Sequence, residues 1–317
     1  MKSELITILG PTASGKTRLA VTIAASNGGE IISADSRQVF RGMDIGSGKD
    51  LHEYGTVPYH LIDIRDAGEE FNVFAFQRLF LETFSRITDR GSLPILCGGS
   101  GMYLDAVLRG YRMVEVPRDE SLRGELANKN DGELVEVLKR LRPELHNSTD
   151  LHERERTVRA IEIARGTLNE VVGEPFPRIN GTVIGIQWER GELRRRIAVR
   201  LEDRLENGMI EEVEALNAAG VTWERLDYYG LEYRYVGAFL RGELTRNELS
   251  VRLHSAICDF AKRQGNWFRR MERHGIVINW VDGAADPAGQ AGEILQREGV
   301  LASDGFPAEK RKMAERR

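Results

Sequence analysis

The chain has 317 residues, of which 41% are hydrophobic and 30% are charged. This balance is typical of a folded globular protein and excludes a disordered or fibrous chain. The formal net charge is −4, from 45 basic and 49 acidic residues, so the overall charge does not indicate a nucleic-acid partner.

The amino-terminal third of the chain alternates strand and helix patterns. Short apolar runs predict buried strands at 4–9, 30–34, 60–64 and 93–97. Helical periodicity covers 16–27, which Gly28-Gly29 ends, and 73–90. Buried strands that alternate with helices predict an α/β fold with a parallel sheet covered by helices on both faces.

The pattern changes between Val116 and Asn180, where no strong strand run appears. Charged segments there predict helices at 120–129, 131–141 and 153–165. We therefore expect a helical insertion, 116–180, between two parts of a discontinuous core, 1–115 and 181–282.

The strand and helix patterns then resume. Strands are predicted at 182–188 and 276–280, and helices at 192–219, 231–241 and 247–273. Residues 283–317 are expected to form a carboxyl tail, with a candidate helix at 289–297 and a disordered basic end from Lys310 to Arg317.

Nothing in the sequence predicts a membrane or secreted protein. No apolar run approaches the roughly 18 residues of a membrane-spanning helix, and the stretch before Pro11 is too short for a secretory signal. Cys97 and Cys258 lie far apart without a CxxC pattern, so we expect free thiols and a cytoplasmic protein.

The first loop carries a phosphate-binding pattern. The motif G-x-x-x-x-G-K-[ST] is matched at every fixed position by Gly10-Pro11-Thr12-Ala13-Ser14-Gly15-Lys16-Thr17. Its backbone N–H groups would face phosphate oxygens, Lys16 would add a positive charge, and the Thr17 hydroxyl would ligate Mg²⁺. The alternative is an ordinary glycine-rich turn between strand and helix. The pattern favours a di- or triphosphate ligand.

Two polar residues follow other predicted strands at the same edge of the sheet. Asp35 ends the second strand, where a carboxylate could bind Mg²⁺, hold a substrate hydroxyl, act as a base or only cap the turn. Ser100 begins a helix after the fourth strand, where its hydroxyl could contact a ligand or serve as an N-cap.

Basic residues recur at helical spacing. Arg196, Arg200 and Arg204 lie beside the apolar stripe of one predicted helix. Like charges at this spacing disfavour a helix by roughly 0.2–0.5 kcal/mol per pair, so this row faces either phosphate or neighbouring carboxylates. Two further basic clusters form either a solvated surface or contacts to phosphate. One consists of Arg154, Arg156 and Arg159, and the other of Lys262, Arg263, Arg269 and Arg270.

In order along the chain, these motifs resemble the tRNA dimethylallyltransferase family. The matching segments are the phosphate loop, 35–49, 60–63, 98–103, 156–162 and 261–264, over roughly residues 1–280. The sequence departs from the family at Ser100, where threonine is usual, at Ile257 and Cys258, where a Thr-Arg pair is usual, and in an altered Gly-Tyr-Arg-Glu-like turn at 229–234.

The resemblance implies a P-loop NTPase-like fold and transfer of a dimethylallyl group from dimethylallyl diphosphate to N6 of an adenine in the tRNA anticodon loop. It implies that Asp35, Ser100 and Lys16 are catalytic, with Mg²⁺ on Thr17. The diphosphate would contact Gly10, Thr12, Ala13, Ser14, Gly15, Lys16, Thr17, Arg196 and Arg200. The tRNA would contact Asp35, Ser36, Arg37, Gln38, Ser100, Arg123, Arg156, Arg159, Lys262 and Gln264.

Three other functions compete with this one. A small-molecule P-loop kinase would place ATP on the loop, and an adenylate isopentenyltransferase would use a free nucleotide as acceptor. The arginines of the insertion favour a macromolecular acceptor instead. A non-catalytic RNA-binding module would not need Lys16 and Thr17 in an intact loop. We expect a monomer with no obligate protein partner.

Overall fold

The computed structural model describes residues 4–113, 115–142, 154–168 and 176–301. Contacts between residues divide the chain into two units, one made of Met1–Tyr111 with Arg178–Arg317 and the other of Arg112–Pro177.

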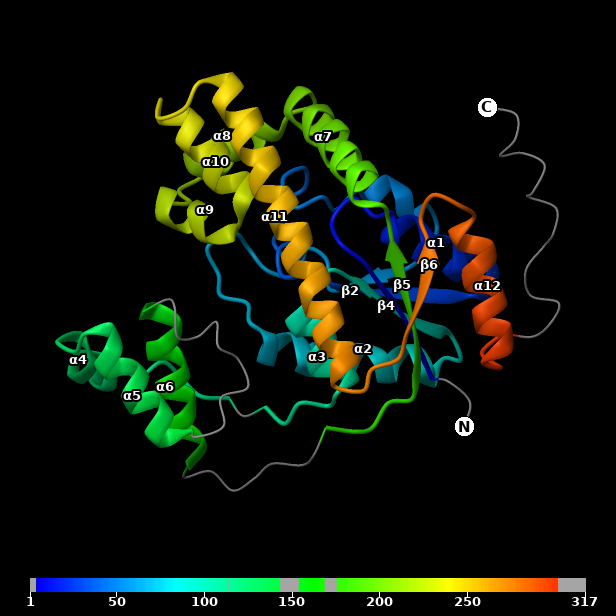
Figure 1. Cartoon of the computed structure of the whole chain (residues 1–317), viewed down its shortest axis with the longest axis horizontal. Coiled ribbons are helices and arrows are strands. Elements are labelled where there is room, and N and C mark those ends of the chain that lie inside the picture. Colours follow the sequence, from blue (N-terminus) through cyan, green and yellow to red (C-terminus); the bar gives the residue numbers. More distant parts are fainter. Residues whose placement is uncertain (1–3, 114, 143–153, 169–175, 302–317) are drawn as a thin grey trace. The chain divides into compact units, whose positions relative to one another are not determined.

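The first unit is built on a six-stranded parallel sheet, as the sequence predicts (Figure 1). The strands are β1 (Leu5–Leu9), β2 (Gly29–Ala34), β3 (Tyr59–His60), β4 (Leu93–Gly98), β5 (Gly181–Gln187) and β6 (Ile278–Asp282). Their spatial order is β3-β2-β4-β1-β5-β6, so β2, β4 and β1 are neighbours. The loops that follow these three strands therefore leave the sheet side by side.

Helices cover both faces of this sheet. The helices of this unit are α1 (Lys16–Asn27), η1 (Leu51–Tyr54), α2 (Val73–Asp89), α3 (Gly101–Leu108), α7 (Arg190–Glu206), α8 (Met209–Ala218), α9 (Trp223–Tyr229), α10 (Leu231–Leu240), α11 (Arg246–Arg273) and α12 (Pro287–Arg297). Of these, α8, α9 and α10 pack against one another and against α7 and α11. Ile6 and Ile8 share a buried cluster with Leu19 of α1 and Leu295 of α12. Because side chains alternate along a strand, the neighbouring residues of each strand face the other side of the sheet, where α2 contacts β2 and β4.

Two sequence predictions in this unit need correction. The strand expected at 60–64 ends at His60, because Leu61 and Asp63 have positive φ angles of 63° and 54° and cannot continue it. The helix expected at 192–219 is broken into α7 and α8 around Gly208, whose φ is 104°. Helix α9 was not predicted, whereas the candidate helix at 289–297 is confirmed as α12, which packs on α1, β5 and β6. The end predicted to be disordered, 310–317, lies outside the described residues.

The second unit contains the helices predicted for the insertion. They are α4 (Glu120–Ala127), α5 (Asp131–Leu141) and α6 (Arg154–Leu168). Their core is aliphatic and includes Leu122, Leu126, Leu134, Leu138 and Ile161. The side chain of Asn130 caps α5 in a capping box with Glu133, which explains where that helix begins.

Two general expectations can be compared with the structure. Among the described residues, the helices are too short or too polar to cross a membrane. Cys97 and Cys258 are free thiols, as predicted, and burial raises the pKa of Cys97 to about 12.

Candidate active site

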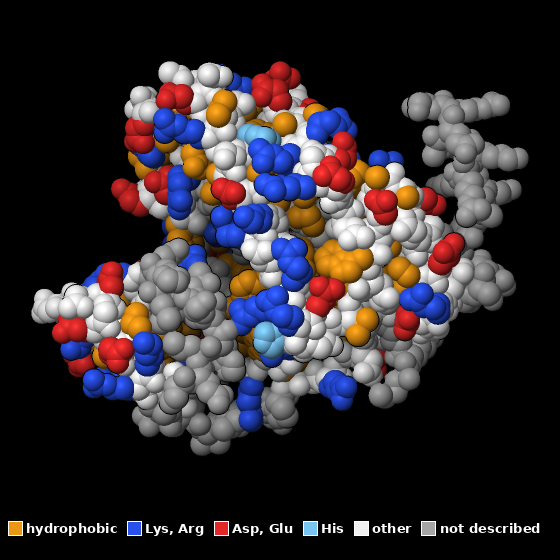
Figure 2. Space-filling view, in the orientation of Figure 1, with side chains coloured by type: hydrophobic (Ala, Val, Ile, Leu, Met, Phe, Trp, Pro, Cys, Tyr) orange, Lys and Arg blue, Asp and Glu red, His pale blue; other side chains and the backbone are white. Residues whose placement is uncertain are grey.

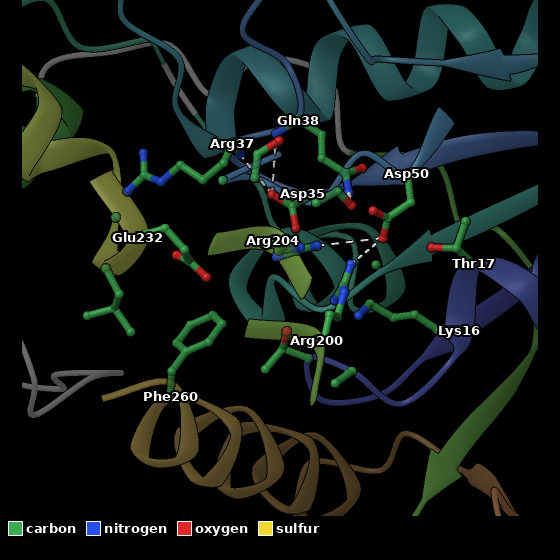
Figure 3. Close-up of a pocket in the computed structure, with 18 of the residues that line it drawn as sticks. Lys16, Thr17, Asp35, Arg37, Gln38, Asp50, Arg200, Arg204, Glu232 and Phe260 are labelled. Atoms are coloured by element: carbon green, nitrogen blue, oxygen red, sulfur yellow. Dashed lines mark hydrogen bonds and ion pairs between the residues drawn. The ribbon is translucent and has the colours of Figure 1, made fainter. Parts of the chain in front are cut away.

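A cavity of about 590 Å³ opens at the carboxyl ends of β1, β2 and β4. Its walls come from the first unit alone. The lining includes Thr12, Ala13 and Gly15–Thr17 of the loop, Asp35–Gln38, Gly46–Gly48, Asp50, Cys97, Gly98, Ser100, four arginines of α7 (Arg195, Arg196, Arg200 and Arg204) and residues 229–233. Figure 3 shows Lys16, Arg200, Arg204, Asp35, Asp50 and Glu232 around this space. The fold thus brings together the loop motifs that the sequence singled out.

The phosphate loop has the geometry of an anion cradle. Ala13 and Gly15 have positive φ angles of 60° and 87°, which curl the backbone before α1 begins at Lys16. Lys16 lines the cavity, and its Nζ donates to the carbonyl of Pro11 at 3.3 Å. Burial, with Arg200 and Arg204 nearby, lowers the pKa of Lys16 from its ordinary value. A phosphate bound here would stabilise the protonated amine.

Side chains from distant parts of the sequence hold the carbonyl side of this loop. Trp188 Nε1 donates to Ser14 O at 3.0 Å, and Arg196 Nε donates to Ala13 O at 2.9 Å while its guanidinium stacks 4.1 Å from the Trp188 ring centre. Arg196, predicted to bind diphosphate, therefore supports the loop that would bind it.

Gln264 connects two loops of the site. Its Oε1 accepts from Thr12 N at 2.8 Å, and its Nε2 donates to Gly99 O at 2.9 Å. The side chain is buried, so both ends of the amide are occupied inside the protein. The sequence assigned Gln264 to tRNA, whereas the structure gives it a positioning contact in the cavity wall.

Asp35 lies where β2 ends and shapes its own turn. Its Oδ1 accepts from the backbone N–H groups of Arg37 at 2.8 Å and Gln38 at 3.4 Å. Ser100 is the N-cap residue of α3, yet its Oγ accepts from Ser36 N at 3.3 Å instead of from that helix. The turn that carries Asp35 is thus tied to Ser100, and both residues face the cavity.

The next two residues of this turn make protein contacts as well. Arg37 Nη2 donates to Tyr228 O at 3.0 Å, and its guanidinium lies over the Tyr228 ring. Gln38 Oε1 accepts from the Ser33 hydroxyl at 2.8 Å, and Nε2 donates to Gly48 O at 3.0 Å. Both side chains therefore help to fix the cavity wall.

Two charged side chains fix the loop between β2 and η1. Lys49 is almost completely buried, and its ammonium contacts Phe40 O and the carboxylates of Asp44 and Asp63. From α8, Glu212 accepts hydrogen bonds from three consecutive backbone N–H groups, 44–46, and from the Tyr233 hydroxyl. The cavity edge 46–50 is therefore held in place before any ligand binds.

The arginine row of α7 meets carboxylates at the cavity. Asp50 accepts a hydrogen bond from Arg200 Nη2, and Arg204 Nη2 lies 3.6 Å from the same oxygen. Burial opposes the charge of Asp50, but the two arginines lower its pKa below the ordinary value. Burial raises the pKa of Glu232, which lines the same cavity.

Sequence reasoning found part of this site and missed the rest. Arg204 was visible only as the third member of the arginine row and Glu232 only as part of the altered turn 229–234, while Asp50 and Glu212 gave no local signal. Among the described residues, no group of three or more His, Cys, Asp or Glu side chains is placed to hold a metal ion. Thr17, whose hydroxyl is predicted to ligate Mg²⁺ together with phosphate oxygens, lines the cavity beside Lys16.

In the second unit, two of the predicted tRNA contacts are engaged elsewhere. Glu162 is buried and accepts from Arg123 Nε at 2.7 Å, from Arg159 Nη1 at 3.0 Å and from Asp119 N at 3.0 Å. Burial alone would raise the pKa of Glu162, but these donors lower it to about 2. Arg123 and Arg159 therefore neutralise a buried acid, while Arg156 is exposed.

Helix α11 carries an exposed basic surface. Arg252, Lys262, Arg263 and Arg269 are exposed there. Figure 2 shows Lys and Arg side chains gathered over the part of this face where α11 lies. The predicted contact residue Lys262 belongs to this basic surface.

Comparison with known proteins gives consistent results. The family model described as "IPP transferase" matches residues 38–271. A "tRNA dimethylallyltransferase 2" of Trichlorobacter lovleyi is 64% identical over 92% of this chain and 96% of its own length, and one of Pelobacter propionicus is 66% identical over 92% and 94%.

Solved structures agree with the sequence comparisons. A tRNA isopentenylpyrophosphate transferase from Bacillus halodurans is similar with a TM-score of 0.68 and 30% identity, over 100% of both chains. A eukaryotic dimethylallyltransferase acting on tRNA has a TM-score of 0.77, covering 95% of this chain and 80% of its own, at 21% identity, which supports the fold alone.

Proposed function

The chain belongs to the IPP transferase family, and we propose that it transfers the dimethylallyl group of dimethylallyl diphosphate to N6 of an adenine in the tRNA anticodon loop. The observation that carries this proposal is that a phosphate loop and the pair Asp35 and Ser100 line one cavity. One side suits a diphosphate leaving group and the other suits an acceptor amine. Because tRNA is the acceptor, the enzyme would act in the cytoplasm.

On the donor side, the loop Gly10–Thr17 would hold the diphosphate with its backbone N–H groups, Lys16 and Arg200. As the allylic C–O bond breaks, negative charge develops on the leaving diphosphate, where preorganised cations are most effective. The Thr17 hydroxyl suits Mg²⁺, which takes few protein ligands when substrate phosphates are present. Bound Mg²⁺ would neutralise charge on the leaving group.

On the acceptor side, Asp35 would orient the adenine amine and take its proton. The amine is a weak nucleophile because its lone pair is delocalised into the ring. The N6–C1 bond forms as the C1–O bond breaks, diphosphate leaves with the bonding electrons, and one N6 proton passes to Asp35. The Asp35 turn is tied to Ser100, so both groups keep their positions. The base must leave its stack to reach this cavity.

Macromolecular recognition would use exposed cations in both units. Lys262 on α11 and Arg156 on α6 are exposed and suited to phosphate contacts. The roles of Arg37, Gln38 and Gln264 would be to shape the pocket that receives the base, because their side chains are already bonded within the protein.

The test is a mass analysis of nucleosides from tRNA incubated with the enzyme, dimethylallyl diphosphate and Mg²⁺. We expect a dimethylallyl-modified adenosine and release of diphosphate only when both substrates are present. Asp35→Asn should slow the chemical step by about 10²–10⁴-fold, whereas Asp89→Asn, at an exposed site on α2, should not. ATP consumption with a small acceptor, or modification of free adenylate but not of tRNA, would refute the proposal in favour of a kinase or an adenylate transferase.

A further inference from the structure

One buried donor in the cavity has no hydrogen-bond partner. The side chain of Arg204 is 11% exposed, and its Nη2 atom is buried without a partner among the described residues. The Asp50 carboxylate lies 3.6 Å from this atom and accepts its hydrogen bond from Arg200 instead. A buried unpaired N–H is costly, and in a preformed cavity it indicates a group that a ligand would satisfy.

The backbone beside Arg204 is shaped to admit this side chain. Gly48 has a φ of 68°, and a Cβ atom there would lie 2.0 Å from Arg204 Nη2 and 2.7 Å from Arg200 Nη2. Only glycine leaves room for both guanidinium groups against the loop. Gln38 holds this turn by donating to Gly48 O at 3.0 Å. Both guanidinium groups therefore pack against the Gly48 turn, which Gln38 holds in position.

The local charges point to an anion as the missing partner. Arg204, Arg200 and Lys16 are close enough for each arginine to lower the pKa of the lysine, and Figure 3 shows the ends of all three near one another. The carboxylates that line the same space are Asp35, Asp50, Glu53, Asp203 and Glu232, of which Glu53 and Asp203 are exposed to solvent. Asp50 is shared between two arginines, and burial raises the pKa of Glu232, which favours its neutral form. An anion with several oxygens would satisfy the remaining donors.

Resting on the function proposed above, we propose that Arg204 is a further diphosphate-binding residue. Its Nη2 donates to the phosphate group farther from the allylic carbon, while the loop and Lys16 hold the diphosphate from the other side. Asp50 is the positioning residue that orients Arg200 and Arg204 toward the cavity. Charge builds up on the diphosphate as the C–O bond breaks, so this contact strengthens during the reaction.

The experiment is calorimetric titration of inorganic diphosphate and, separately, inorganic phosphate into the full chain without tRNA. We expect Arg204→Met, which keeps the length but removes the charge, to weaken diphosphate binding by about 10–100-fold. Binding of monophosphate should change by less than about threefold, because Arg204 would reach only the second phosphate. The matched control is Arg194→Met, an exposed arginine of the same helix, which should bind like the parent.

Turnover and folding complete the test. The kcat/KM for dimethylallyl diphosphate should fall at least as much as affinity, and the tRNA KM should stay unchanged. Arg204→Lys keeps the charge without the forked donor and should give an intermediate loss, so it carries the test if Arg204→Met does not fold. Normal diphosphate affinity in a folded Arg204 variant would overturn this inference. If Lys16→Met also bound diphosphate normally, the proposed function itself would fail.

Discussion

Replacing Glu162 by Gln removes one negative charge from the interior of the second unit. The side chain of Glu162 is buried, and it accepts from Arg123, Arg159 and the backbone of Asp119. Removing one member of a buried ion pair typically costs about 3–5 kcal/mol, because the remaining charge is left uncompensated. A unit of this size, Arg112–Pro177, has a total stability of roughly 3–10 kcal/mol at ~0.05–0.15 kcal/mol per residue.

We therefore expect the helices α4, α5 and α6 of Glu162→Gln to unfold more than about 10 °C below the parent, at roughly 4–8 °C per kcal/mol. Far-UV circular dichroism measures this loss. Tryptophan fluorescence follows the other unit separately, because all four tryptophans, 188, 223, 267 and 280, belong to it. The control is Glu155→Gln, which removes an exposed partner of Arg123 and should cost less than about 1 kcal/mol.

The pH dependence gives a second measurement on the same residue. Its pKa is about 2 in the folded protein against an ordinary value of 4.5, so the folded state binds fewer protons between these values. The stability that Glu162 contributes is complete above about pH 4.5 and is lost as the pH falls toward 2. Glu162→Gln should lack this acid-induced loss. An unchanged melting midpoint, or an equal loss in Glu155→Gln, would refute this assignment of Arg123 and Arg159.

Glu212→Ala should remove the acceptor of three backbone N–H groups and loosen the edge of the cavity. The loss of one charged acceptor should lower kcat/KM for dimethylallyl diphosphate by about tenfold in steady-state kinetics. A wild-type value would exclude a positioning role for Glu212. Lys262→Ala should reduce the slope of the logarithm of the tRNA binding constant against the logarithm of the salt concentration by about 0.7–0.9. A slope equal to that of the parent would mean that Lys262 is a solvated surface residue without a phosphate contact. The Glu30 pKa is lowered to about 2, chiefly by the Arg90 hydrogen bond, so its contribution to stability is complete above about pH 4.5 and disappears toward pH 2. Glu30→Gln should abolish that part of the acid sensitivity in tryptophan fluorescence, and an identical acid titration would contradict it.

The sequence predicted elements that depend on local patterns. The phosphate loop combines a motif with its strand and helix context, and the helices α1, α2, α5 and α11 follow regular apolar periodicity, so their existence and approximate ends were predictable. The end of β3 at His60 was not predictable, because the apolar composition of 60–64 does not show that Leu61 and Asp63 adopt positive φ angles.

Charge partners were the harder part of the site. Arg123 and Glu162 are separated by 39 residues, and Arg200 and Asp50 by 150, so spacing within one helix could not reveal either pair. An arginine row indicates only that anions face it. Whether those anions are substrate phosphates or protein carboxylates is decided by tertiary contacts, and this chain uses Asp50 between two of the arginines.

The amide of Gln264 links the phosphate loop to the loop that follows β4. Its oxygen accepts from Thr12 N of the phosphate loop, and its nitrogen donates to Gly99 O. Gly99 precedes Ser100, whose hydroxyl accepts from Ser36 N. Glutamate would lose the donor, lysine would lose the acceptor, and asparagine is one methylene too short to span the gap. This side chain therefore couples the two loops mechanically, so a displacement of the phosphate loop is transmitted to the loop that carries Ser100.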